Sequence, residues 1–122
     1  MQLDHIVLTA KDIHTTAKFY EQLGFELRTF KEDRLALHFG QQKINLHQSG
    51  KAFEPHAKHP TPGSLDLCFL LDDPLQSFID RLENRGIPII EGPIERTGAS
   101  GPIMSIYIRD PEGNLLEFAA HI

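Results

Sequence analysis

The sequence has few of the residues expected of a membrane, secreted or nucleic-acid-binding protein. Its single cysteine, Cys68, excludes an internal disulfide, and a cytoplasmic location is therefore predicted. No run approaches the roughly 18 apolar residues of a membrane span. The start, Met1 to His5, lacks the basic and apolar regions of a signal peptide. The net charge of −5 disfavours nucleic acid and acidic membranes as partners.

The composition is that of an ordinary globular domain. With 122 residues the chain is long enough for one hydrophobic core, and its 40% apolar and 24% charged residues are typical values. Seven histidines are more than usual for this length, so metal binding is a hypothesis worth testing.

The first part of the chain has the pattern β-α-β-β-β. Residues 3–10 are apolar and β-branched and predict a buried strand that contains His5. Asp12 is a helix-capping residue, an apolar face follows it, and Gly24 ends the helix. Three short strands are predicted after the helix, at 25–30, 35–39 and 43–47.

The second part repeats this pattern. Residues 49–63 form a connector without periodicity, and a buried strand is predicted at 65–71. Asp72 or Asp73 is predicted to cap a helix with Pro74 in its first turn and Gly86 at its end. Three strands are then predicted at 88–94, 103–109 and 115–120.

The two parts match position by position, as the products of an internal repeat do. His5 corresponds to Asp66 in the opening strands, and Asn45 corresponds to Glu117 in the closing strands. The predicted fold class is α+β, with two paired β-α-β-β-β modules, residues 1–48 and 64–122, whose sheets enclose a shared cavity. The whole chain is predicted to be one domain.

The most informative segment runs from Arg109 to Phe118. Its centre, Pro-Glu-Gly-Asn, is typical of a tight turn between two strands. Glu117 stands between two large apolar residues and therefore faces the other side of its strand. An interior carboxylate needs a cation or a metal as its partner. The sequence leaves two interpretations open, an ion pair between His5 and Glu117 or a metal site.

These features resemble the vicinal oxygen chelate superfamily, which includes glyoxalase I, extradiol dioxygenases and bleomycin resistance proteins. The resemblance rests on the two modules, on the opening Asp-His-Ile-Val-Leu strand and on Arg-Asp-Pro-Glu-Gly-Asn-Leu-Leu-Glu-Phe at residues 109–118. It covers essentially the whole chain. Residues 39–47 and 96–105 look like the glyoxalase domain-containing protein 5 branch.

The resemblance implies a divalent metal (Zn, Ni, Mn or Fe(II)) held by the first and last strands of each module. His5 and Glu117 match the family's ligand positions, whereas Asp66 stands where histidine is usual. Asn45 stands where the family usually has Glu, Gln or His, and His47 lies on the same face two residues further on. One possible set, His5, His47 and Glu117, matches the facial triad of Fe(II) oxygenases. The other, His5, Asp66 and Glu117 with Asn45 or water, favours Lewis-acid chemistry.

The predicted function follows from this resemblance. It is a metal-dependent enzyme of glyoxalase or lyase type that acts on a small vicinally oxygenated substrate through a metal-chelated enediolate. Glu117, if it can leave the metal, is the candidate catalytic base. Arg96 and Arg109 are candidates for binding a substrate carboxylate or phosphate. The alternatives are an Fe(II)-dependent dioxygenase and a non-catalytic, resistance-type binding protein, and a homodimer is expected because sheet edges need covering.

Overall fold

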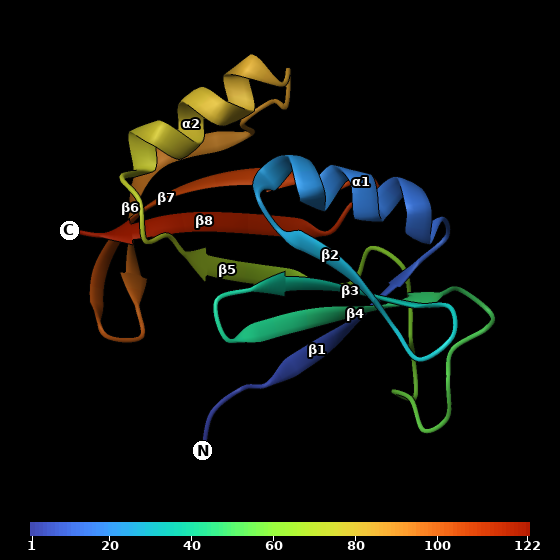
Figure 1. Ribbon diagram of the computed structural model, residues 1–122. Helices are drawn as coiled ribbons and strands as arrows, with labels where there is room; N and C mark the ends of the chain where they lie inside the picture. The colour runs from blue at the N-terminus through green and yellow to red at the C-terminus, as the bar shows by residue number, and fades with distance from the viewer. The chain divides into compact units, whose positions relative to one another are not determined.

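The computed structural model describes all 122 residues and contains eight strands and two helices. The chain divides into two compact units (Figure 1). Unit 1 comprises residues 1–65 and the turn 110–114, and unit 2 comprises residues 66–109 and 115–122. Each unit has one four-stranded mixed sheet and one helix, which confirms the predicted α+β class and the repeat. Neither helix is long and apolar enough to cross a membrane.

Unit 1 contains a sheet with the strand order β1-β4-β3-β2. Its strands are β1 (His5–Ala10), β2 (Glu26–Phe30), β3 (Arg34–Phe39) and β4 (Gln42–Gln48). β1 and β4 are parallel, and the other pairs are antiparallel. The helix α1 (Ile13–Leu23) contacts all four strands on one face of this sheet. The other face of the sheet therefore carries the alternate side chains, among them those of His5, Asn45 and His47.

The ends of α1 are those that the sequence predicts. The Asp12 carboxylate accepts hydrogen bonds from the backbone N–H groups of His14 (3.0 Å) and Thr15 (3.2 Å). Gly24 ends the helix with φ at 106°, a conformation that a side chain would strain. The side chains of Ala17 and Tyr20, on the buried face of α1, lie in the core of unit 1.

Unit 2 repeats the arrangement with the strand order β5-β8-β7-β6. Its strands are β5 (Asp66–Leu70), β6 (Glu91–Gly98), β7 (Gly101–Arg109) and β8 (Leu115–His121). The helix α2 (Leu75–Asn84) buries Phe78 against Phe118 of β8, with ring centroids 4.4 Å apart. Residues of β8 on the same face as Phe118 therefore point to the helix, and Glu117 points to the opposite face.

Two boundaries in unit 2 differ from the prediction. Neither Asp72 nor Asp73 caps α2, because Pro74 itself occupies the N-cap position and no side chain bonds to the first turn. β6 begins at Glu91 rather than at residue 88 and continues to Gly98. Pro93 lacks a backbone N–H, and the pairing register shifts between Glu91 and Ile94, so regular pairing extends only beyond this point.

The turn at residues 110–114 is a structural anchor of unit 1. The buried Asp110 carboxylate accepts hydrogen bonds from the Tyr20 hydroxyl (2.8 Å) and from the backbone and side chain of Asn114 (2.9 and 2.8 Å). The Asn114 side-chain oxygen in turn accepts a bond from the backbone N–H of Leu65 (2.9 Å). These buried contacts account for the presence of an aspartate and an asparagine in the turn motif.

Candidate functional site

The candidate metal ligands occupy equivalent register positions in the two units. In unit 1, His5 pairs with Lys43, and Asn45 lies two residues further along β4. In unit 2, Asp66 pairs with Leu115, and Glu117 lies two residues further along β8. Residues two apart on a strand share a face, so His5 and Asn45 are diagonal neighbours on one sheet, as Asp66 and Glu117 are on the other. The correspondence read from the sequence therefore agrees with the strand register.

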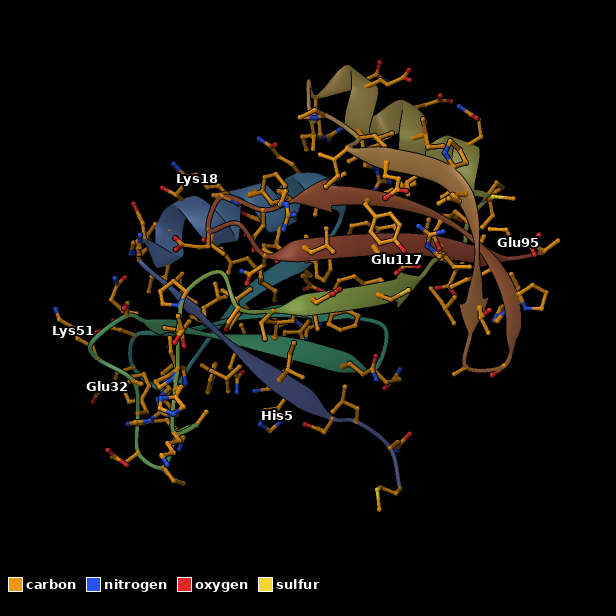
Figure 2. All side chains as sticks on the ribbon, turned by 180° about the vertical axis from the view of Figure 1, so that it is seen from behind. His5, Lys18, Glu32, Lys51, Glu95 and Glu117 are labelled. Atoms are coloured by element: carbon orange, nitrogen blue, oxygen red, sulfur yellow. The ribbon has the colours of Figure 1, made fainter.

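Glu117 is fixed within unit 2 by neighbouring side chains. The hydroxyl of the fully buried Ser105 on β7 donates a hydrogen bond of 2.6 Å to the Glu117 carboxylate. The side chains of Tyr107 and Cys68 also hydrogen-bond with Glu117 from the strands on either side. Figure 2 shows Glu117 on β8, directed away from α2. The sheet thus holds this carboxylate in one orientation.

The neighbours of Glu117 are in their neutral forms at pH 7. Desolvation, followed by the nearby negative charge of Glu117, raises the pKa of Cys68 to about 11. The pKa of Tyr107 is also raised, chiefly by desolvation and further by its hydrogen bond to Glu117. Both groups therefore keep their protons and can donate them to the carboxylate in hydrogen bonds. The Cys68 thiol is a poor nucleophile in this state.

The two candidate substrate arginines lie at different places in unit 2. Arg96 on β6 donates a hydrogen bond of 3.1 Å from Nε to the Tyr107 hydroxyl and lies 3.4 Å from the Glu91 carboxylate. Arg96 is thereby linked to Glu117 through Tyr107. Arg109 is the last residue of β7, is exposed, and shares a face with Tyr107 by strand alternation.

The imidazole ring of His5 is oriented by a neighbouring carboxylate. Its Nδ1 lies 2.8 Å from the Asp4 carboxylate, and its side chain is 46% exposed. A carboxylate on one ring nitrogen fixes the tautomer and leaves Nε2 free to bind elsewhere, an arrangement typical of metal-ligating histidines.

His47 does not lie beside His5. It pairs with Thr9, four residues along β1 from His5, so at about 3.3 Å per residue the two histidines are separated by about 13 Å. One copy of unit 1 therefore cannot supply both histidines to a single ion. Within neither unit do three or more His, Cys, Asp or Glu side chains converge as a metal-binding group.

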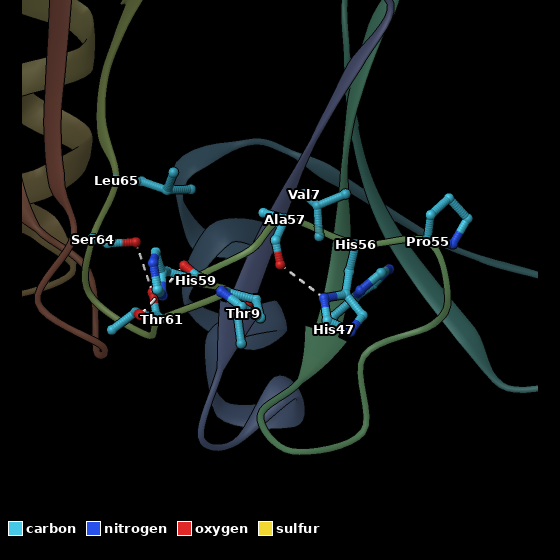
Figure 3. Close-up of a pocket in the computed structure, with 11 residues that line it drawn as sticks. Val7, Thr9, His47, Pro55, His56, Ala57, His59, Thr61, Ser64 and Leu65 are labelled. Atoms are coloured by element: carbon cyan, nitrogen blue, oxygen red, sulfur yellow. Dashed lines mark hydrogen bonds between the residues drawn. The ribbon is translucent and has the colours of Figure 1, made fainter.

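His47 instead lines a pocket of about 170 Å³ in unit 1 (Figure 3). The connector 49–63 closes this pocket over the β1–β4 side of the sheet. Its apolar walls include Val7, Pro60 and Leu65, and its polar walls include Thr9, His56 and His59. The two connector histidines, His56 and His59, thus lie at the edge of a pocket.

The environment of His47 lowers the pKa of its imidazole. Desolvation is the main cause, and the positive charges of Arg34 and His56 add to it. We expect the His47 resonance, followed by proton–nitrogen NMR against pH, to titrate below the ordinary histidine value of about 6.5. Because the unfolded chain then binds the proton more readily, the contribution of His47 to folding stability declines as the pH falls below about 6.5.

Replacing Arg34 with methionine should raise the His47 pKa, since one unfavourable charge is removed. Arg85→Met, at an exposed position in unit 2, is the matched control and should leave it unchanged. A His47 pKa at or above the ordinary value in the native chain would contradict this electrostatic description.

The chain belongs to the superfamily that its sequence resembles. Residues 2–118 match the model of the Glyoxalase/Bleomycin resistance protein/Dioxygenase superfamily. The match spans both units, and the paired β-α-β-β-β architecture is the one expected from the resemblance.

Individual relatives resemble the chain over nearly its whole length. It is 57% identical to the virulence protein STM3117 of Salmonella typhimurium, covering 99% of this chain and 85% of that protein. It is 51% identical to the glyoxalase domain-containing protein RDO1 of Mycosarcoma maydis, covering 98% of this chain and 68% of that protein.

Solved structures share the fold. The crystal structure of STM3117 matches with a TM-score of 0.97 at 56% identity, covering 100% of this chain and 98% of that one. A lactoylglutathione lyase from Agrobacterium tumefaciens matches with a TM-score of 0.73 at 25% identity, covering 98% of this chain and 92% of that one.

Sequence reasoning missed the residues that support Glu117. Ser105 and Tyr107 are polar side chains of β7 that share its face with Arg109, and they alternate with Met104, Ile106 and Ile108. This alternation was a usable signal, because polar residues on one face of a strand opposite a carboxylate are candidates for bonding it.

Proposed function

We propose that the chain is a metal-dependent enzyme of glyoxalase or lyase type that acts on a small, vicinally oxygenated molecule. The observation that supports this most directly is the equivalent placement of His5 with Asn45 and of Asp66 with Glu117 at matching register positions. The kinship to the glyoxalase domain-containing protein 5 branch stays a prediction.

The donor set fits a divalent ion. His5 would offer Nε2, and Asp66 and Glu117 would offer carboxylate oxygens. The buried side-chain oxygen of Asn45 makes no hydrogen bond within the protein and is a further oxygen donor. One imidazole with several oxygens suits Zn, Ni or Mn, while Fe(II) remains compatible with this mixture. When bound, such an ion would supply Lewis-acid polarisation of adjacent substrate oxygens.

The residues of unit 2 would carry out the proton transfer. Glu117 is the candidate base: its carboxylate would have to leave the metal to take a proton from the substrate carbon next to a carbonyl. Ser105 and Tyr107 orient the carboxylate, and Arg96 holds Tyr107 in place. Arg109 is the candidate for binding an anionic group of the substrate, since it stands exposed on the Glu117 face.

A direct test is solvent deuterium exchange at the carbon next to the carbonyl of α-hydroxyketones and hemithioacetals. Chain reconstituted with nickel, zinc or manganese should catalyse exchange, observed by proton NMR. Glu117→Gln should abolish it, because the amide retains the shape but cannot accept the proton. Equal exchange in the native chain and in Glu117→Gln would refute the assignment of the base.

Ser105→Ala removes the bond that orients Glu117. We expect about a 10-fold loss of affinity for the divalent ion, since residues that support a metal ligand have effects of this size. Competition with a chromogenic chelator would measure it. Ser77→Ala, at an exposed position of α2, is the matched control. Unchanged metal affinity in Ser105→Ala would show that this hydrogen bond does not support metal binding by Glu117.

The two alternative functions, a dioxygenase and a non-catalytic binding protein, depend on different residues. The dioxygenase alternative relied on His5 and His47 together, and the register separates these residues. Aerobic oxygen consumption by the iron-loaded chain would still support it. A non-catalytic binding protein is favoured by Asp66 and Asn45 standing in place of the family's usual ligands, and its ligand binding should be insensitive to chelators.

The proposal includes an oligomeric state and a cellular location for the protein. Each sheet has two edge strands, β1 and β2 in unit 1 and β5 and β6 in unit 2. Such edges favour association, so we propose a homodimer. The single cysteine supports a cytoplasmic location. The proposed partners are limited to the small-molecule substrate and a second copy of the chain.

A further inference from the structure

We propose that Lys43 of unit 1 selects substrates that carry a carboxylate, because its ammonium group binds that negative charge. The inference deepens the proposed function and rests on it. Lys43 pairs with His5 across β1 and β4 and lies two residues before Asn45 on β4, so it shares the sheet face of both candidate metal ligands. A lysine on this face can contact the molecule that the metal binds.

The sheet face that carries Lys43 is positively charged, although the chain as a whole is not. By strand alternation this face also presents Arg28 of β2 and Arg34 of β3. Among the paired strand residues of this face, Glu26 of β2 is the only carboxylate. Three permanent cations thus accompany one anion, whereas the net charge of the chain is −5. Such a local excess of positive charge attracts anionic ligands.

The two arginines of this face are engaged elsewhere. Nε and Nη2 of Arg28 donate to the two carboxylate oxygens of Glu26 at 3.1 and 2.9 Å, so these two charges balance one another. The guanidinium of Arg34 lies over the ring of Phe53 in the connector, 3.7 Å from its centroid. Over the strands themselves, Lys43 is therefore the cation without an anionic partner.

The ammonium group of Lys43 is held in place by an aromatic ring. Its Nζ lies 4.1 Å from the centroid of the Phe30 ring, and no carboxylate forms a salt bridge with it. The ring attracts the cation on one side and leaves the remaining N–H groups to donate on the other. An incoming carboxylate would thus accept hydrogen bonds from an ammonium group that is already positioned.

The alkyl stem of Lys43 crosses the sheet to reach that ring. Lys43 lies on β4 and Phe30 on β2, so their side chains meet across β3, which separates the two strands. The β3 residue at the middle of this face is Ala36, which pairs with Arg28 on one side and with Asn45 on the other. Its small side chain leaves room for the stem to lie against the sheet. Lys43 is accordingly half-buried rather than extended into solvent.

His38 adds a neutral hydrogen-bond donor beside Lys43, its partner in the β3–β4 ladder. Desolvation is the main cause that lowers the pKa of the His38 imidazole, the positive charges of Arg28 and Lys43 add to it, and Glu26 acts in the opposite direction. The neutral ring carries one N–H group. One positive charge with one neutral donor matches a singly charged carboxylate, whereas a phosphate dianion would keep an unbalanced negative charge.

Lactate and lactamide test the inference, since they have nearly the same shape and differ in charge. Each is titrated at constant ionic strength into chelator-treated protein and followed by proton–nitrogen NMR of the backbone amides. Lactate should give saturable shifts at Ala36, His38 and Lys43. Lactamide should bind at least about 10-fold more weakly, because hydrogen bonds to a charged group are lost. At a pH of about 7.5, where methyl phosphate is a dianion, it should bind no more tightly than lactate.

Variants of Lys43 test the residue itself. Lys43→Met keeps an apolar stem without the charge and should weaken lactate binding by about 10-fold, with little effect on lactamide. Lys43→Arg retains the charge and should retain more affinity than the methionine variant. Lys18→Met, at an exposed position of α1 in the same unit (Figure 2), is the matched control. Circular dichroism confirms the folding of each variant.

Phe30→Leu tests the positioning of the ammonium group. It leaves the charge of Lys43 intact but removes the ring that holds it. An intermediate loss of lactate affinity, about 2- to 5-fold, is expected from the size of a cation–π interaction.

The inference and the proposed function can fail separately. Lactate binding is measured without metal, whereas deuterium exchange needs the metal-loaded chain. If exchange occurs but lactate binding does not depend on Lys43, the inference alone is overturned. If lactate binding depends on Lys43 but no exchange occurs, the proposed reaction fails and Lys43 remains a carboxylate-binding residue.

Several outcomes would overturn the inference. They are equal binding of lactate and lactamide, tighter binding of methyl phosphate than of lactate, and shifts centred on Arg109 of unit 2 instead of Lys43. Unchanged lactate affinity in Lys43→Met, or no saturable shift with lactate at about 50 mM, would do so too.

Discussion

Glu117→Ala is expected to lower the affinity of the chain for divalent metal by at least about 100-fold. The change removes a ligand carboxylate, whereas loss of a supporting residue alone costs 10- to 100-fold, roughly. It also leaves the Ser105 hydroxyl without its 2.6 Å acceptor. Isothermal titration calorimetry with nickel or zinc, on protein stripped with a chelator, measures the affinity directly.

Glu95→Ala is the matched control for this prediction. Glu95 lies on β6 in the same unit, is exposed, and also appears in Figure 2. The control should bind metal as the native chain does. Equal affinity in the native chain and in Glu117→Ala would show that Glu117 is not a ligand, and its bond to Ser105 would then be purely structural.

Asp110→Ala is expected to destabilise the protein by about 3 to 5 kcal/mol. Asp110 is 5% exposed and accepts bonds from Tyr20, from Asn114 and, at 2.9 Å, from the backbone N–H of Glu112. Alanine would leave these buried donors without an acceptor. For a chain of this length the loss corresponds to a decrease in Tm of about 10 to 20 °C, measurable by calorimetry.

Two controls separate the parts of this effect. Tyr20→Phe deletes only one donor and should cost about 1 to 2 kcal/mol. Asp33→Ala, at an exposed position in the turn between β2 and β3, should change Tm little. If Asp110→Ala lowered Tm no more than Asp33→Ala does, the buried hydrogen bonds of Asp110 would contribute nothing to stability.

The sequence predicted the elements whose signals are local. Asp12 and Gly24 mark the ends of α1 because capping and left-handed geometry depend on adjacent residues. The repeat predicted the paired modules, and it aligned Asn45 with Glu117 because both follow the same apolar alternation. These features do not depend on distant contacts.

The features that the sequence did not predict depend on pairing between distant segments. Tyr20 and Asp110 meet across 90 residues, and neither has a local signal for the other. The separation of His5 from His47 follows from the register of two parallel strands, which parity alone does not fix. The start of β6 depends on where Pro93 allows pairing.

The most direct test of the proposed metal site is the metal content per chain of tag-free protein, measured by elemental analysis after anaerobic reconstitution. The proposed function predicts about one divalent ion per chain in the native protein and little in His5→Ala, with His14→Ala as the control that retains it. Nickel, zinc or manganese would support the lyase, and iron would support the dioxygenase. A native chain that retains no metal, or a His5→Ala chain that retains as much as the native one, would contradict the proposed site.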